Sequence, residues 1–104
     1  MTGPGAWSHA ELVEELWQRF QPLASQRVRA LEEYAGACAE GRATAAERAT
    51  AAKAAHDLEG GLGSYGRPEG SRWAAAFLVA LPEAGSDPRR LAEVAAQLRS
   101  LVGQ

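Results

Sequence analysis

Apolar residues recur every three or four positions along nearly the whole chain, which predicts helices. Sustained apolar–polar alternation is missing, so a sheet is not expected. The first helix begins after Ser8, which forms a capping-box pattern with Glu11, and Pro22 is expected to end it. A second helix then runs to about Gly41. Its expected inner face consists of Leu23, Val28, Leu31, Tyr34, Ala35 and Cys38.

Three further helices follow the same logic. Thr44 and Glu47 form a second capping-box pattern, and the stripe behind them consists of Ala51, Ala55, Leu58, Leu62 and Tyr65. Pro68 opens the next helix at a first-turn position. Asp87, directly before Pro88, is expected to cap the last one. The inward positions of these two helices are Trp73, Phe77, Leu81, Leu91, Val94, Ala95, Leu98 and Leu101.

The pattern predicts an all-α fold, an antiparallel up-and-down four-helix bundle with a short additional N-terminal helix. The 104 residues suffice for one domain with a modest core. We expect a flexible leader over residues 1–6 and a single helical bundle domain over 7–104. The tryptophans at positions 7, 17 and 73 are expected to anchor the core.

Composition narrows the classes of function. A formal net charge of −2 gives no basic face for nucleic acid. No apolar run reaches the roughly 20 residues that a membrane span needs, and the first residues show no secretory signal. The one cysteine, Cys38, cannot form an internal disulfide, which suits a reducing compartment. A cytoplasmic protein is therefore expected.

Few residues carry chemistry. The two histidines, His9 and His56, are far apart, and neither His-x-x-x-His nor Cys-x-x-Cys spacing occurs, so no metal site is expected. The glycines after His56 do not form a phosphate-binding loop, and no serine or cysteine has the local signature of a nucleophile. The acidic residues are scattered, and most have Lys or Arg three or four positions away, as is typical of solvent-exposed helix faces. His56 remains as the candidate reactive group.

His56 is expected to face solvent, because it lies roughly 140° from the centre of the apolar stripe on its helix. Its neighbours one and two turns away on the same face are Ala49, Ala52, Gly60 and Gly63. These four residues predict a smooth docking surface around the imidazole, close to which another protein's backbone could come. An inert surface histidine on an alanine-rich helix is the simpler alternative.

An exposed imidazole is a competent nucleophile near neutral pH and can carry a phosphoryl group on nitrogen. Phosphoryl transfer depends on in-line positioning and charge neutralisation more than on acid–base groups. A carrier therefore needs little beyond an exposed ring and room for a partner that supplies the metal and the acceptor carboxylate.

The segment around His56 resembles the motif of histidine-containing phosphotransfer (HPt) domains. Residues 55–66 read Ala-His-Asp-Leu-Glu-Gly-Gly-Leu-Gly-Ser-Tyr-Gly, and 68–72 continue with Pro-Glu-Gly-Ser-Arg. The Leu-Trp-x-x-Phe segment from Leu16 to Phe20 and the length are also similar. The resemblance implies a four-helix bundle in which His56 is phosphorylated and Gly60 leaves space beside it. It also implies a carrier that is not an enzyme and needs no cofactor of its own.

The resemblance further implies the partners, which are a sensor or hybrid histidine kinase and a response-regulator receiver domain that brings Mg²⁺. We expect no nucleic acid and no membrane among the partners, and a monomer.

One position departs from the family. Lysine is common three residues after the histidine, where this chain has Glu59. A carboxylate one turn from a phosphohistidine is repulsive, by roughly 1 kcal/mol or less at an exposed site. Lys53 lies three residues before His56 on the same face and could replace the missing cation. It could equally be the solvated partner of Asp57 at i+4, and the two roles are compatible.

Two other classes of function stay open. In the first, the bundle docks on a receiver or kinase without carrying phosphate, an alternative that Glu59 keeps open. In the second, the chain is a plain scaffold or dimerisation module that buries Trp7 or Trp17 between copies.

Overall fold

The computed structural model describes residues 8–83 and 87–103 and is helical throughout, with no strand in these ranges. The helices are α1 (His9–Ala39), α2 (Ala45–Ser64), α3 (Pro68–Ala80) and α4 (Pro88–Val102), with a short 3₁₀ turn, η1 (Leu81–Glu83), after α3. The expected all-α fold with four principal helices is confirmed. The predicted leader (1–6), together with Trp7, lies outside the described residues.

The helix starts follow from local chemistry. Ser8 accepts a hydrogen bond from the Glu11 amide while the Glu11 carboxylate accepts one from the Ser8 amide, and Thr44 and Glu47 repeat this reciprocal pair. Both predicted capping boxes are therefore confirmed. Asp87 occupies the cap position of α4, but its side chain makes no capping bond. Its backbone departs from the extended conformation of Ser8 and Thr44. The predicted cap position is confirmed, but the expected capping hydrogen bond is not formed.

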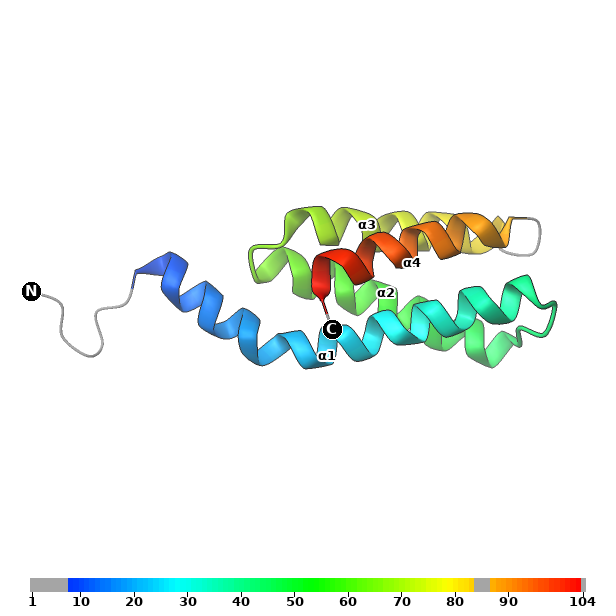
Figure 1. Ribbon diagram of the computed structural model, residues 1–104, viewed down its shortest axis with the longest axis horizontal. Helices are drawn as coiled ribbons and strands as arrows, with labels where there is room; N and C mark the ends of the chain where they lie inside the picture. Colours follow the sequence, from blue (N-terminus) through cyan, green and yellow to red (C-terminus); the bar gives the residue numbers. More distant parts are fainter. Residues whose placement is uncertain (1–7, 84–86, 104) are drawn as a thin grey trace, which may run out of the picture.

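The predicted break at Pro22 is wrong, and the short additional N-terminal helix is the first part of α1. Pro22 lies inside this 31-residue helix. Proline removes one backbone donor and crowds the preceding turn, at a cost of about 3 kcal/mol. Burial on both sides, of Trp17 before it and Ala24 and Val28 after it, favours continuing the helix. Figure 1 shows α1 bending near this point, which is the usual response to an internal proline.

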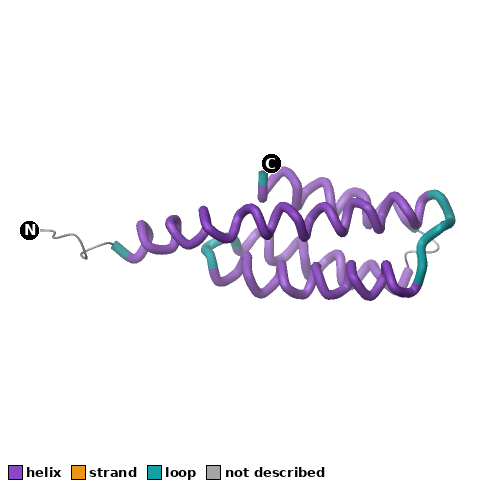
Figure 2. The backbone as a smooth tube through the Cα atoms, turned by 90° about the horizontal axis from the view of Figure 1, so that it is seen from below, coloured by secondary structure: helices purple, strands orange, loops and turns teal. Residues whose placement is uncertain are grey.

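The four helices form a bundle in which α1 contacts α2 and α4, and α3 contacts the same two helices. The loops after α1 and after α2 lie at opposite ends of the four-helix bundle (Figure 1). The first turns of α1 extend beyond the other helices in both views (Figures 1 and 2). The large side chains that are fully buried between the helices are Phe77, Leu31, Leu58, Leu62, Leu91, Leu98, Val28 and Val94.

Some predicted inward positions are exposed instead. Leu23 is 43% exposed and Leu101 is 37% exposed, so both lie at the margin of the faces assigned to them. Leu12 and Leu16 are exposed as well, whereas Trp17 beside them is buried. Trp17 is buried as expected, whereas Trp73 is only half-buried.

A polar cluster joins α4 to α1. The Arg99 guanidinium donates to both carboxylate oxygens of Glu32 at 3.2 and 2.9 Å. It also donates to the hydroxyl of buried Ser25 at 2.7 Å and to the Ser25 carbonyl at 3.2 Å. The Glu32 hydrogen bond raises the pKa of Arg99 further, so the charge persists at all accessible pH values. Arg99 thus fixes the last turns of α4 on α1.

We expect Arg99→Met to lower the free energy of unfolding by about 1–3 kcal/mol, because charge-assisted hydrogen bonds are lost and the Ser25 hydroxyl loses its partner. Urea unfolding followed by circular dichroism measures this change. Arg19→Met is the matched control, since Arg19 forms an exposed i,i+4 pair with Glu15 and should change stability by less than about 0.5 kcal/mol. Equal effects of the two variants would contradict the bridging role of Arg99.

Candidate functional site

His56 lies in the middle of α2 with its side chain exposed to solvent, as the periodicity predicted. The residue before it, Ala55, and the one two positions after it, Leu58, are both 0% exposed. The helix is therefore fixed to the core on one side of its axis while the imidazole stands on the other. This arrangement presents the ring without a flexible loop.

The surface around the ring has few side chains. Ala49, Gly60 and Gly63 are exposed and Ala52 is half-buried. A Cβ atom added at Gly60 would meet nothing within 4 Å, and one at Gly63 would make only ordinary contact with the Ser71 side chain. The four residues predicted as a docking surface thus lie on one open helix face. Whether a partner docks there remains a prediction.

The charged residues near His56 lie on two different sides. Lys53 is paired with Asp57, with 3.1 Å between the ammonium nitrogen and a carboxylate oxygen, so the expected i+4 pair is confirmed. The same oxygen lies 3.7 Å from the guanidinium of Arg27, which comes from α1. Glu59 is half-buried on the side facing α3, where its carbonyl accepts a 2.7 Å hydrogen bond from the Ser71 hydroxyl.

Arg27 is a residue that sequence reasoning did not find. It is separated from Asp57 by the rest of α1, a loop and more than half of α2, so no local spacing connects the two. Its guanidinium carbon also lies 5.7 Å from the centre of the Phe20 ring, which is cation–π distance. The only sequence signal was the position of Arg27 beside the apolar face of its helix.

Gly61 has a structural role that the sequence did not indicate. A Cβ atom there would lie 2.6 Å from the tip of the Phe20 ring, so a side chain cannot be added without moving the ring. Phe20 in turn stacks on Tyr65 at 4.7 Å between ring centres. The neighbouring glycines therefore differ: Gly60 opens the outer face of α2, and Gly61 allows α1 to approach the helix.

A groove of about 370 Å³ runs between α1 and α2 beside the His56 face. Lys53 and Asp57 form part of its wall on α2, and Arg27 and the half-exposed Leu23 form part of it on α1. The groove combines an apolar side chain with a cluster of charges. It lies on the opposite side of His56 from Glu59.

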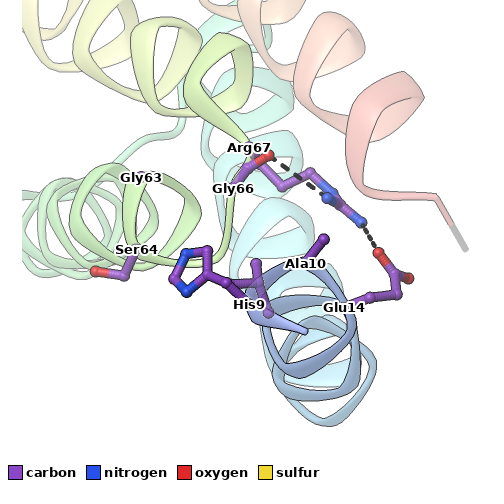
Figure 3. A pocket seen from close by; sticks show the side chains of 8 residues that line it. His9, Ala10, Glu14, Gly63, Ser64, Gly66 and Arg67 are labelled. Carbon is purple, nitrogen blue, oxygen red and sulfur yellow. Dashed lines mark hydrogen bonds and ion pairs between the residues drawn. The ribbon is translucent and has the colours of Figure 1, made fainter. Parts of the chain in front are cut away.

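A second hollow, of about 480 Å³, lies where the start of α1 meets the end of α2 (Figure 3). His9 points from α1 toward Ser64 there, and Gly63 of the predicted docking surface lies beside it. Arg67 closes another side through an ion pair with Glu14 at 3.1 Å. Its guanidinium also stacks over Trp17 at 4.5 Å, so Trp17 is buried within the chain itself.

Within residues 8–83 and 87–103, no group of three or more histidine, cysteine or acidic residues is placed to hold a metal ion. None of the helices described is long and apolar enough to cross a membrane. Comparisons with protein-family models, with curated proteins and with solved structures found no match for this chain.

Proposed function

We propose that this chain is a phosphorelay intermediate of two-component signalling, with His56 carrying the phosphoryl group. The observation that supports it most directly is an exposed imidazole on a helix fixed to the core, surrounded by Ala49, Ala52, Gly60 and Gly63. The antiparallel up-and-down topology of HPt domains is part of the proposal. The four contacting helices and the loops at opposite ends of the bundle support it.

The chemistry needs little from the carrier. A ring nitrogen of neutral His56 attacks the phosphorus of a receiver's aspartyl phosphate, so that an N–P bond forms as the P–O bond to the carboxylate breaks. The carboxylate leaves with the electron pair, and the other ring nitrogen gives up its proton to water. In the onward step, a carboxylate of the next receiver attacks the phosphorus, so that an O–P bond forms as the N–P bond breaks. The ring nitrogen leaves with the electron pair, and the imidazole takes back a proton from water. A partner would supply Mg²⁺ and in-line positioning, while this chain presents the ring.

The partners follow from this scheme. A sensor or hybrid histidine kinase, or its receiver, donates the phosphoryl group, and a response-regulator receiver accepts it. The carrier acts as a monomer in the cytoplasm, has no catalytic activity without a partner and binds no cofactor of its own. The groove between α1 and α2 and the open face at Gly60 are the surfaces that such a partner would meet.

Intact-mass analysis tests the proposal directly. The purified chain is incubated with phosphoramidate, or with a phosphorylated receiver, and is then analysed at neutral and at acidic pH. One added phosphoryl group that is stable at neutral pH and lost in acid supports the proposal. A folded chain that gains none from a panel of donors would contradict it.

Docking without phosphotransfer is the second candidate, and two observations favour it. Glu59 stands where the family commonly has lysine, and the nearby Lys53 is already paired with Asp57. A module of this kind would bind a receiver or kinase with unchanged affinity after His56→Gln. Titration of that variant against a receiver, beside the phosphorylation assay, separates the two candidates.

The charge at position 59 gives a further prediction. We expect Glu59→Lys to lengthen the lifetime of phospho-His56 or to speed its formation, because a repulsive carboxylate is replaced by an attractive ammonium. Each of the two charge changes, loss of the carboxylate and gain of the ammonium, contributes about 1 kcal/mol or less near the surface, which corresponds to up to about fivefold for each change. The decay of the phosphorylated mass at neutral pH measures the lifetime, with Glu69→Lys on α3 as a control. Identical kinetics in Glu59→Lys and the parent chain would mean that the side chain points away from the phosphoryl group.

A further inference from the structure

Three charged side chains meet beside His56, and they differ in how firmly they are held. One carboxylate oxygen of Asp57 lies 3.1 Å from the Lys53 ammonium and 3.7 Å from the Arg27 guanidinium. The side chains of Asp57 and Arg27 are only 28% and 26% exposed, whereas that of Lys53 is 78% exposed. Lys53 is thus by far the most exposed member of this cluster of Arg27, Lys53 and Asp57.

Arg27 has a second contact that keeps it in place. Its guanidinium lies over the ring of Phe20, and Phe20 is fixed between Gly61 and Tyr65. Arg27 can therefore stay beside Asp57 whether or not Lys53 is there. The hydrogen bond from Lys53 is the main cause that holds the pKa of Asp57 below its ordinary value, and the charges of Arg27 and His56 act in the same direction against desolvation. Asp57 is ionised at neutral pH.

The cluster lies within reach of the imidazole. At about 100° per residue, Lys53 is about 60° from His56 around the helix, and Asp57 is about 100° away in the same direction. Both lie on the side that faces α1, since Asp57 pairs with Arg27. Glu59 lies about 60° from His56 in the other direction. Lys53 is therefore the cationic side chain of α2 nearest in angle to His56, and Asp57 draws it away.

We propose that Asp57 withholds Lys53 from His56 and thereby sets the lifetime of the phosphohistidine. The proposal rests on the phosphorelay function proposed above. A phosphoryl group on His56 competes with Asp57 for the Lys53 ammonium. The transfer of Lys53 costs little, because its long side chain is exposed and Arg27 continues to neutralise Asp57. The cluster therefore holds an ammonium group that can move to the phosphoryl group once His56 is phosphorylated.

The lifetime of phospho-His56 depends on the position of the Lys53 ammonium because of the way the N–P bond is hydrolysed. Hydrolysis forms an O–P bond from water and breaks the N–P bond, and the ring nitrogen leaves with the electron pair. Prior protonation of the ring makes this nitrogen a better leaving group. An ammonium close to the ring disfavours that protonation and slows hydrolysis. Release of Lys53 from Asp57 should therefore prolong the phosphorylated state.

A double-mutant cycle tests the proposal. Phospho-His56 lifetimes are measured at low salt for the parent chain, Asp57→Asn, Lys53→Gln and the double variant. We expect Asp57→Asn to lengthen the lifetime by about two- to fivefold and Lys53→Gln to shorten it by a similar factor. In the Lys53→Gln background, the gain from Asp57→Asn should disappear. Lys53→Arg should preserve the parent lifetime, and the differences should shrink at 0.5 M salt, a concentration at which the Debye length falls to about 4 Å.

Glu15→Gln is the matched control, because Glu15 and Arg19 form an equivalent i,i+4 pair on α1, and its lifetime should equal that of the parent. If Asp57→Asn has no effect, or has the same effect in both backgrounds, Asp57 does not act through Lys53 and the proposal is overturned. If the parent and the variants are all phosphorylated and their phospho-His56 lifetimes are equal, this inference is overturned but the proposed function is not. A parent chain that accepts no phosphoryl group would overturn the proposed function, and this inference with it.

Discussion

His56→Gln should abolish the acid-labile phosphoryl group completely, while the chain remains folded and as stable as the parent. Glutamine keeps a polar side chain of similar reach but offers no nucleophilic nitrogen. The exposed position of residue 56 means that no core contact is lost. Intact-mass analysis at neutral pH measures the phosphoryl group, and thermal unfolding measures stability.

His9→Gln is the control, because His9 is the second of the two histidines in the chain and also lies on the surface. It should be phosphorylated at His56 as fast as the parent. Retention of the label in His56→Gln, or its loss in His9→Gln, would assign the phosphoryl group to another residue. If the parent chain binds a receiver but gains no phosphoryl group, the docking-only candidate is favoured.

Gly60→Leu should reduce phosphoryl transfer from a receiver by at least tenfold, which corresponds to about 1.4 kcal/mol or more of lost docking energy. The reason is bulk, since leucine would stand one turn from His56 on the face that a partner approaches. The fold should tolerate it, because a Cβ at this position meets nothing within 4 Å. Helix propensity even favours leucine over glycine by up to about 1 kcal/mol. Rapid-mixing transfer assays and urea unfolding measure the two effects.

Gly61→Leu is the matched comparison at the next residue. There the added side chain collides with the Phe20 ring, so we expect the free energy of unfolding to fall by about 1–3 kcal/mol.

Labelling by phosphoramidate, which needs no protein docking, should survive in Gly60→Leu. If Gly60→Leu transfers normally from a receiver, the face around Gly60 is not the docking surface.

The sequence predicted those features that depend on residues close together in the chain. Both capping boxes, the outward position of His56 and the Lys53–Asp57 pair are set by spacings of three or four residues on one helix. The features it missed depend on residues far apart. Arg27 meets Asp57, and Phe20 meets Gly61, only after α1 and α2 have packed together. No single-helix pattern contains that information.

The prediction at Pro22 failed for a related reason. The local rule for proline describes an isolated helix, whereas packing against the rest of the bundle also acts on α1. Burial of Trp17 and Val28 on either side of Pro22 favours one continuous helix. The exposed Leu12, Leu16 and Leu23 show the converse, since helical spacing of apolar residues does not ensure that another helix covers them.

The proline within α1 has a further consequence for how the helix opens. The carbonyl of Gln18 has no amide donor at position 22, so the hydrogen-bond ladder of the helix is interrupted there. Before the interruption Trp17 is the one buried side chain, whereas Ala24, Ser25, Val28, Leu31, Tyr34, Ala35 and Ala37 are buried after it. Amides of the first segment should therefore exchange with solvent through local fraying, and those of the second through global unfolding. We therefore expect this single bent helix to open as two separate cooperative units that meet at Pro22.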